Sequence, residues 1–259
     1  MSNNQLYEKE ELIADLHAIG NRLAKPTTIY LIGGCAMSLK NLKRVTKDVD
    51  IIFTSVDDLR VFEEELLALG YQRSEKVDNV YTQLGAYSIL RHKEKAGFDL
   101  FYLQVCNMLI LSEGMIKRAS KYSDMGHLSI YLISNEDISL FKAITERPRD
   151  IDDIYVLISA SQKTGEFDWD AIKEECESQA EQLKIEGHLY ERFNELFSKY
   201  KIKAPLMSWL RKRDIKNILH EAYKIRIEKG LRHDDILNEF EKEGFSKADL
   251  KILNGFGKK

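Results

Sequence analysis

Apolar side chains near the start of the chain recur first at helical and then at strand-like spacing. Between residues 6 and 23, one helical face carries Leu12, Ile13, Leu16, Ile19 and Leu23, and Lys25-Pro26 follows where a helix has to end. The next apolar run, residues 28–32, is short and rich in β-branched side chains, and it stops at Gly33-Gly34. Residues 36–39 favour a short helix. The pattern predicts a helix, a strand, a glycine turn and a second helix.

Strand and helix patterns alternate over the next hundred residues. We predict a strand over 48–53, an amphipathic helix over 56–69 that ends at Gly70, and strands over 86–92, 98–103 and 128–133. The polar connection 93–97 ends in glycine, which is typical of a hairpin loop. Ser134 precedes a helical pattern over 138–143 as a helix cap does, and helical patterns dominate from there to the end.

The change from mixed patterns to nearly all-helical patterns predicts an α/β fold with two parts. It occurs near Thr164-Gly165-Glu166, so we expect a mixed-sheet domain over residues 1–165 and a helical C-terminal domain over 166–259. Prolines are few and scattered. With no proline-rich linker between them, the two parts are expected to pack together.

Composition and charge describe an ordinary globular protein. The 259 residues are 44% hydrophobic with a formal net charge of −3, so any binding to nucleic acid requires a local patch. Cys35, Cys106 and Cys176 show no metal-ligand spacing, which favours reduced thiols. The first residues lack the pattern of a signal peptide, and no window reaches the roughly 18 apolar residues of a membrane span. We expect a cytoplasmic protein with no membrane partner.

Acidic residues within two predicted strands are the strongest candidates for chemistry. Side chains alternate along a strand, so Asp48 and Asp50 project from one face. Paired carboxylates repel each other unless a proton or cation lies between them, and Mg²⁺ prefers carboxylate oxygens. Asp99 lies in another apolar strand, where an ionised group needs a partner or solvent. If the two strands are neighbours, three carboxylates converge on a site for two Mg²⁺ ions; a solvated strand edge is the alternative for each aspartate alone.

The ordered combination of these motifs resembles a known family. The run Leu31-Ile32-Gly33-Gly34-Cys35-Ala36-Met37-Ser38-Leu39, followed by Arg44-Val45-Thr46-Lys47-Asp48-Val49-Asp50-Ile51, is similar to the signature of the DNA polymerase β nucleotidyltransferase superfamily. The form of the motif most resembles stand-alone prokaryotic members, including the AbiEii and MenT toxin-type enzymes. The resemblance covers about residues 28–160 and includes Lys142, Arg147, Asp150 and Asp153.

The resemblance implies a polymerase β-like mixed sheet with flanking helices and a role for each matching residue. Asp48, Asp50 and Asp99 would be the catalytic residues and metal ligands, with Asp99 binding the metal that activates the acceptor hydroxyl. The backbone of Gly33 and Gly34 would approach the triphosphate of the NTP donor, ATP among the candidates. Cys35 follows the turn and the serine of the family's Gly-Ser variant is absent, so Ser38 or Thr46 would supply the hydroxyl contact to phosphate. The remaining nucleotide-binding candidate is Lys142. Asp150 and Asp153 share a helix face, which favours salt bridges over metal binding.

Basic residues gather in the C-terminal part of the chain. Between residues 199 and 232, eleven Lys or Arg stand against three Asp or Glu, a local charge of +8. Such a patch can hold a polyanion, with Trp209, Tyr200 and Tyr223 as stacking surfaces, and Arg211, Lys212 and Arg213 are its candidate acceptor-binding residues. The alternative is a solvated helix whose basic residues surround an apolar face.

These observations together predict a Mg²⁺-dependent enzyme that transfers a nucleoside monophosphate from NTP to an acceptor hydroxyl. The candidate acceptors are RNA, such as a tRNA 3′ end, or a protein, and the toxin-type resemblance suggests an antitoxin protein as partner. One alternative is a small-molecule nucleotidyltransferase of the antibiotic-modifying type, for which an acidic acceptor surface is expected. The other is a nucleotide-binding regulatory protein without turnover, against which the complete aspartate triad argues.

Overall fold

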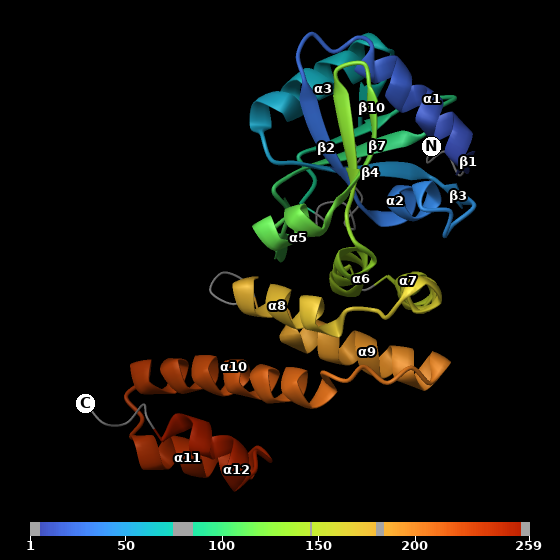
Figure 1. The fold of residues 1–259 in the computed structure, drawn as a ribbon. Coiled ribbons are helices and arrows are strands. Elements are labelled where there is room, and N and C mark those ends of the chain that lie inside the picture. The colour runs from blue at the N-terminus through green and yellow to red at the C-terminus, as the bar shows by residue number, and fades with distance from the viewer. Residues whose placement is uncertain (1–5, 75–84, 146, 180–183, 255–259) are drawn as a thin grey trace.

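A seven-stranded mixed sheet and a stack of helices make up the computed structural model, which describes residues 6–74, 85–145, 147–179 and 184–254 (Figure 1). The strand order is β10-β11-β2-β4-β7-β6-β5. The pairs β11/β2 and β4/β7 are parallel and the others antiparallel. The strands of the sheet are β2 (Thr27–Leu31), β4 (Asp48–Phe53), β5 (Gln72–Arg73), β6 (Ser88–Arg91), β7 (Gly97–Tyr102), β10 (Ser120–Met125) and β11 (Leu128–Leu132). The predicted α/β class with a mixed sheet is confirmed.

Two helices cover one face of this sheet. They are α1 (Lys9–Gly20) and α3 (Val56–Ala68), and Leu59, Phe62 and Leu66 on α3 are buried. The ring of Phe62 packs against Phe53 of β4 at 5.4 Å and Phe98 of β7 at 6.0 Å between centroids. Since side chains alternate along a strand, the neighbours of Phe53 and Phe98 point to the opposite face.

The described chain also contains several short elements. They are the two-residue strand pairs β1 (Tyr7–Glu8) with β3 (Val45–Thr46) and β8 (Gln104–Val105) with β9 (Leu109–Ile110), and the helices α2 (Gly33–Leu39) and α5 (Glu113–Arg118). Below them in Figure 1 lie α6 (Asn135–Ile144), α7 (Asp150–Thr164), α8 (Trp169–Gln179), α9 (Glu186–Tyr200), α10 (Met207–Glu228), α11 (His233–Lys242), α12 (Lys247–Leu250) and a short 3₁₀ helix, Lys251–Leu253. None of the described helices is both long and apolar enough to cross a membrane.

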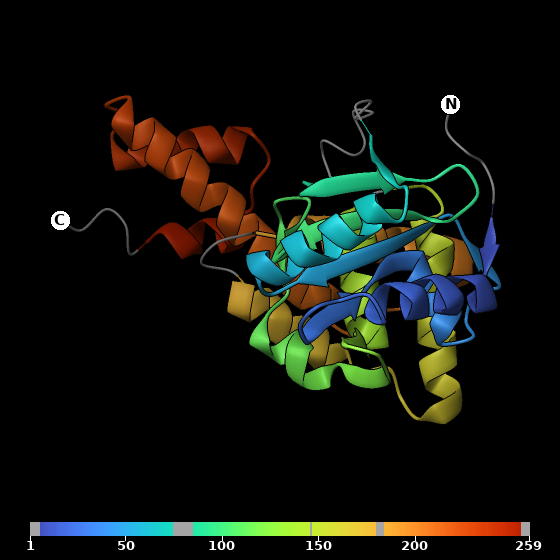
Figure 2. The ribbon, with the colours of Figure 1, turned by 90° about the horizontal axis from the view of Figure 1, so that it is seen from above.

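The hydrophobic core continues from the sheet into the helices. One cluster of buried side chains extends from Tyr7 to Leu210 and therefore includes α8 and α9. A second, smaller cluster joins the C-terminal half of α10 to α11 and α12. In Figure 2 these last helices, orange to red, project from the rest of the molecule. The domain boundary near residue 165 stays a prediction, and we propose that the 166–259 part divides again within α10.

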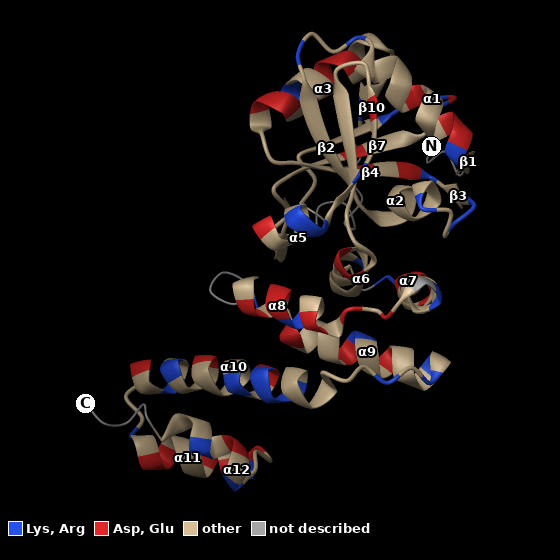
Figure 3. Cartoon of the chain, viewed as in Figure 1, with Lys and Arg blue, Asp and Glu red and all other residues tan. Residues whose placement is uncertain are grey.

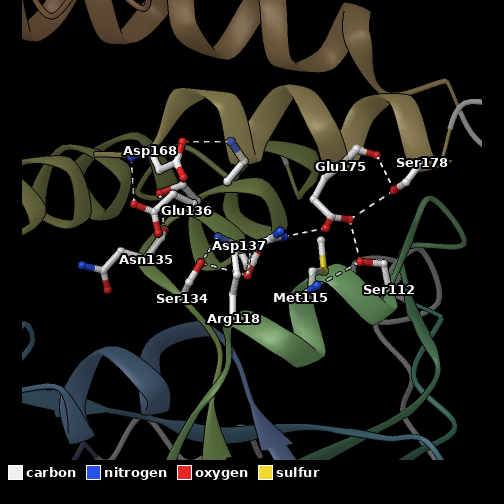
Figure 4. Close-up of polar contacts among 12 residues, drawn as sticks. Ser112, Met115, Arg118, Ser134, Asn135, Glu136, Asp137, Asp168, Glu175 and Ser178 are labelled. Carbon is white, nitrogen blue, oxygen red and sulfur yellow. Dashed lines mark hydrogen bonds and ion pairs between the residues drawn. The ribbon is translucent and has the colours of Figure 1, made fainter. Parts of the chain in front are cut away.

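A buried ion-pair network joins α5, α6 and α8 (Figure 4). The guanidinium of Arg118 donates to Asp137 of α6 at 2.7 Å and to Glu175 of α8 at 2.5 Å. Ser134 caps α6 by accepting a hydrogen bond from the Asp137 amide, as its position in the sequence predicts, and Ser112 donates to Glu175. Asp137 and Glu175 are fully buried. Since buried carboxylates are costly without partners, Arg118 fixes the helical part against the sheet.

Candidate active site

The parallel pair β4/β7 brings the predicted aspartates together. Its register places Asp50 opposite Asp99 and Asp48 opposite Gly97. Because alternate residues share a face, the side chains of Asp48, Asp50 and Asp99 project from the face that α1 and α3 leave open. The sequence-based expectation that these strands are neighbours is confirmed.

An arginine that the sequence analysis did not single out lies between two of these carboxylates. Arg91, at the end of β6, donates from Nη1 to Oδ1 of Asp99 at 2.7 Å, and its Nη2 lies 3.6 Å from Oδ1 of Asp48. β6 and β7 form the predicted hairpin, with Ile89 opposite Asp99. Arg91 is two positions after Ile89, so its side chain lies on the same face of the sheet as that of Asp99. A basic residue at this spacing in the hairpin is the sequence signal that could have identified Arg91.

Gly33 lies directly against the carboxylate of Asp50. Its φ of +62° is unfavourable for other residues, and a Cβ built there would be 2.3 Å from Asp50 Oδ2. The backbone amide of the preceding Ile32 donates to the Asp50 carbonyl at 3.1 Å. The glycine turn predicted from the sequence therefore borders the carboxylate site, and α2 begins at Gly33 rather than at residue 36.

The residues around α2 that were expected to contact phosphate lie near opposite ends of this helix. A Cβ on Gly34 would be 2.9 Å from Oγ1 of Thr46, and that hydroxyl donates to the backbone carbonyl of Asp48 at 3.1 Å. Ser38 lies at the other end of α2, where it lines a pocket of about 460 Å³. Its hydroxyl is buried with no hydrogen-bond partner among the described residues. Burial raises the pKa of the Cys35 thiol, whose Sγ donates to the carbonyl of Ile32.

Lys142 is held in a buried ion-pair cluster. Its ammonium lies 2.8 Å from Asp150 and 2.7 Å from Asp153, and Lys43 approaches the same Asp153 at 3.1 Å. The salt-bridge interpretation of Asp150 and Asp153 is confirmed, with lysines as the partners. Burial and the two carboxylates restrain the ammonium of Lys142. Its contact with phosphate stays a prediction.

Burial, followed by charge repulsion, raises the pKa values of two aspartates on the carboxylate face. The pKa of Asp50 is raised by burial and by the neighbouring charges of Asp99 and Asp48, while Arg147 and Lys142 lower it in part. Burial also raises the pKa of Asp99; the guanidinium of Arg91 opposes this rise, and the charge of Asp48 adds to it. The face therefore carries more negative charge than its neighbours neutralise, which is the condition under which a cation binds.

The donor chemistry of this face fits a hard divalent cation, but the present side-chain arrangement is not a ligand set. Three carboxylates on adjacent strands are the ligands that Mg²⁺ prefers. Across the described part of the chain, no group of three His, Cys, Asp or Glu side chains is arranged to hold a metal ion. The guanidinium of Arg91 lies beside Asp48 and Asp99, and the assignment of the aspartates as metal ligands stays a prediction.

The three basic residues predicted to bind an acceptor do not form one patch. Arg213 pairs with Glu186 at 3.0 Å and lies over the ring of Trp209. Lys212 is exposed, and Arg211 lines a pocket of about 360 Å³ together with Tyr190 and Phe197. Figure 3 shows acidic and basic positions interleaved along α10. Much of the positive charge counted in the sequence is thus compensated locally.

Comparison with known proteins assigns the central part of the chain to a family model. Residues 9–204 match the model described as a nucleotidyltransferase of unknown function (DUF6036). The matched segment starts in α1 and ends just before α10, so it contains the whole sheet and leaves α10–α12 outside. No curated protein sequence matches the chain.

Several chains in solved structures also match, among them those of two structures of ANT(2″)-Ia. One is a solution structure of the antibiotic-resistance factor ANT(2″)-Ia, with 13% sequence identity over 66% of this chain and 90% of that one, at a TM-score of 0.43. The other is a crystal structure of ANT(2″)-Ia in complex with adenylyl-2″-tobramycin, with 15% identity over 60% of this chain and 88% of that one, at a TM-score of 0.41.

Proposed function

The chain belongs to the DUF6036 family of nucleotidyltransferases, and from this premise we propose that it transfers a nucleoside monophosphate from NTP to an acceptor hydroxyl with the help of Mg²⁺. The proposed site is the carboxylate face of β4 and β7. The observation that carries the proposal is the register that sets Asp50 beside Asp99, with Asp48 two residues away and Gly33 against Asp50.

Each residue of this face has a proposed role. Asp48, Asp50 and Asp99 would hold one or two Mg²⁺ ions, which when bound lower the pKa of an acceptor hydroxyl and neutralise charge on the triphosphate. Because Gly33 and Gly34 have no side chains, their backbone can lie directly against Asp50 and Thr46. Lys142 contributes positive charge from its ion pairs with Asp150 and Asp153, as its lowering effect on the pKa of Asp50 indicates.

We propose RNA, with a tRNA 3′ end as one case, as the leading acceptor, and the helical part as the region that selects it. Support comes from Arg211 and Lys212, and from the aromatic side chains of Tyr190 and Phe197, which share the pocket of Arg211. Exposed rings beside cations can stack bases and contact phosphates. The alternative macromolecular acceptor is a protein hydroxyl. With either acceptor, we propose that the enzyme acts as a toxin with an antitoxin protein as its partner.

A small-molecule acceptor is the second candidate, and one observation favours it. Besides Arg213, Lys199 pairs with Asp152 and Arg226 pairs with Glu239 and Glu243. These contacts reduce the basic surface available to a polyanion. A regulatory protein that binds nucleotide without turnover is the third outcome that the following experiment separates.

The test is incubation of the purified protein with each α-³²P-labelled NTP, Mg²⁺, and total cellular RNA and protein. We expect label on an RNA or protein band with the wild type, and none with the Asp48→Ala, Asp50→Ala variant. Asp57→Asn, which removes an exposed carboxylate on α3, is the matched control and retains labelling. In a parallel reaction that also contains the low-molecular-weight fraction of a cell extract, consumption of NTP without a labelled macromolecule would indicate a small-molecule acceptor. NTP binding without consumption in either reaction would indicate a regulatory protein.

A further inference from the structure

Arg91 occupies the position between Asp48 and Asp99 that a cation bound to these carboxylates would need. Its Nη1 bonds Oδ1 of Asp99 at 2.7 Å, and its Nη2 lies 3.6 Å from Oδ1 of Asp48. Nη1 also donates to the backbone carbonyls of Leu90 at 3.0 Å and Phe98 at 3.5 Å. The guanidinium is thus held by both strands of the hairpin as well as by the carboxylates.

The backbone beside the guanidinium leaves room for it. Gly97 faces Asp48 in the β4/β7 register, and a Cβ at this position would lie 2.5 Å from Asp48 Oδ1 and 2.7 Å from Arg91 Nη1. Any other residue at position 97 would push the guanidinium or the carboxylate away. The close approach of Arg91 to Asp48 therefore depends on this glycine.

Burial differs sharply between the partners of this ion pair. The side chain of Asp99 is 3% exposed, whereas that of Arg91 is 32% exposed. A buried ionised carboxylate without a counter-charge is costly, so Asp99 needs a cationic partner whenever it is ionised. Arg91 can turn toward solvent without leaving the surface of the protein, and the exchange of one cation for another is therefore possible at Asp99.

We propose that Arg91 is the resident counter-ion of the carboxylate site, which positions Asp48 and Asp99 before a divalent cation binds and releases Asp99 when one does. This inference rests on the proposed function and goes beyond it by adding a positioning residue. The guanidinium and the cation compete for the same oxygen of Asp99, so Arg91 weakens cation binding while it stabilises the cation-free protein.

The sign of this effect separates competition from ordinary structural support. If Arg91 merely supported the site, its removal would weaken cation binding. If Arg91 competes, Arg91→Gln should bind the cation about tenfold more tightly, because a positive charge at hydrogen-bonding distance from the ligands has been removed at a partly exposed site. The same variant should melt at a lower temperature without cation and regain stability when the cation is added.

The experiment is titration of the full-length protein with Mn²⁺, followed by calorimetry and by the electron paramagnetic resonance signal of free Mn²⁺. Arg91→Gln is compared with Arg91→Lys, which keeps the charge and should stay within about threefold of the wild type. Arg22→Gln is the matched control. Arg22 pairs with Glu65 of α3, on the covered side of the sheet, and should leave Mn²⁺ affinity unchanged.

A second measurement on the wild type avoids any dependence on how a variant folds. In protein labelled with ¹⁵N-arginine, the Nη signals of Arg91 should be restrained without Mg²⁺ and become averaged when Mg²⁺ is added. Unchanged or weaker Mn²⁺ binding by Arg91→Gln, or Arg91 signals that ignore Mg²⁺, would overturn the competition while the proposed function stands. Mn²⁺ binding that persists in Asp48→Ala, Asp50→Ala, or no binding in any protein, would overturn both.

Discussion

At the scale of single residues, Gly33 and Gly97 show how absent side chains shape the candidate site. A Cβ at either position would lie within 2.5 Å of an aspartate oxygen, and Gly33 also has a positive φ. Asp50 can lie against Gly33, and Asp48 against Gly97, only because neither glycine has a side chain. The requirement is steric, so it can be tested by adding one methyl group.

We predict that Gly33→Ala lowers both stability and activity. The methyl group would displace the carboxylate of Asp50, and the left-handed backbone adds strain of about 1–3 kcal/mol. Urea denaturation measures the first effect, and the rate of nucleotide transfer measures the second. Gly165→Ala is the control, since a Cβ there meets nothing within 4 Å. Equal stability of the two variants would mean that the turn tolerates a side chain.

The sequence predicted the aspartates of the site but not their counter-ion. Alternation along a strand is enough to place Asp48 and Asp50 on one face, and the motif order suggests Asp99 beside them. The contact of Arg91 depends on the register between β6 and β7, which a single sequence does not determine. Lys142 was expected at a phosphate, whereas the structure pairs it with two aspartates that an isolated helical pattern cannot assign to it.

At the scale of elements, the junction of α5, α6 and α8 depends on one buried cation. Arg118 is the shared partner of Asp137 and Glu175, both of which are buried. We predict that Arg118→Met lowers the free energy of unfolding by about 3–5 kcal/mol, because two buried carboxylates lose their counter-charge. Urea denaturation at pH 7.5 measures this loss. Lys117→Met is the control, since Lys117 is largely exposed and its removal should change stability by less than about 0.5 kcal/mol.

The loss in Arg118→Met should shrink as the pH falls. Burial raises the pKa of Asp137 although Arg118 lowers it, so removal of Arg118 should raise this pKa further and let the folded variant take up a proton at a higher pH than the wild type does. A group with a raised folded pKa contributes stability at low pH and loses it as the pH rises through that pKa. A deficit that is constant between pH 7.5 and pH 5 would contradict this account.

Elements with a strong apolar pattern were predicted and polar ones were missed. The predicted strand 48–53 matches β4, and the predicted helix 56–69 matches α3 to within one residue, because each has a clear period and α3 has a Ser55 cap. β10 was missed because its sequence, SKYSDM, is polar and it forms an edge of the sheet, where one side of the strand needs no apolar pattern. The two-residue strands and α5 are too short to produce a periodic signal.

At the scale of the whole molecule, we propose that the charge of the helical part influences which acceptor the protein binds. We predict that Arg211→Glu, Lys212→Glu weakens binding of RNA and reduces the slope of log affinity against log salt by about 1–2, since two phosphate contacts are lost. Filter binding at several salt concentrations measures both quantities. Lys242→Glu, Lys247→Glu makes the same change in net charge at exposed positions on α11 and α12, and should have little effect. Identical salt slopes for the two variants would remove this region from RNA binding.

The domain boundary is harder to predict from the sequence than the fold class. The boundary near residue 165 stays a prediction, and the last strand, β11, already ends at Leu132. A helical pattern does not reveal whether its apolar face packs on the sheet side or on other helices. The structure places α8 and α9 in the same hydrophobic cluster as the sheet, and the family match also extends to residue 204. The small hydrophobic cluster of α10–α12 lies outside the main hydrophobic cluster and outside the segment matched by the family model.

The central claim is that the carboxylate face of β4 and β7 transfers a nucleotide and releases pyrophosphate. The most direct test is a reaction with NTP labelled at both the α and γ phosphates, run with the wild type and with Asp99→Asn. The account predicts α label on the acceptor and an equal amount of γ label in pyrophosphate, with both reduced on the order of 10³-fold or more in the variant. γ label on the acceptor, or undiminished transfer by Asp99→Asn, would contradict it.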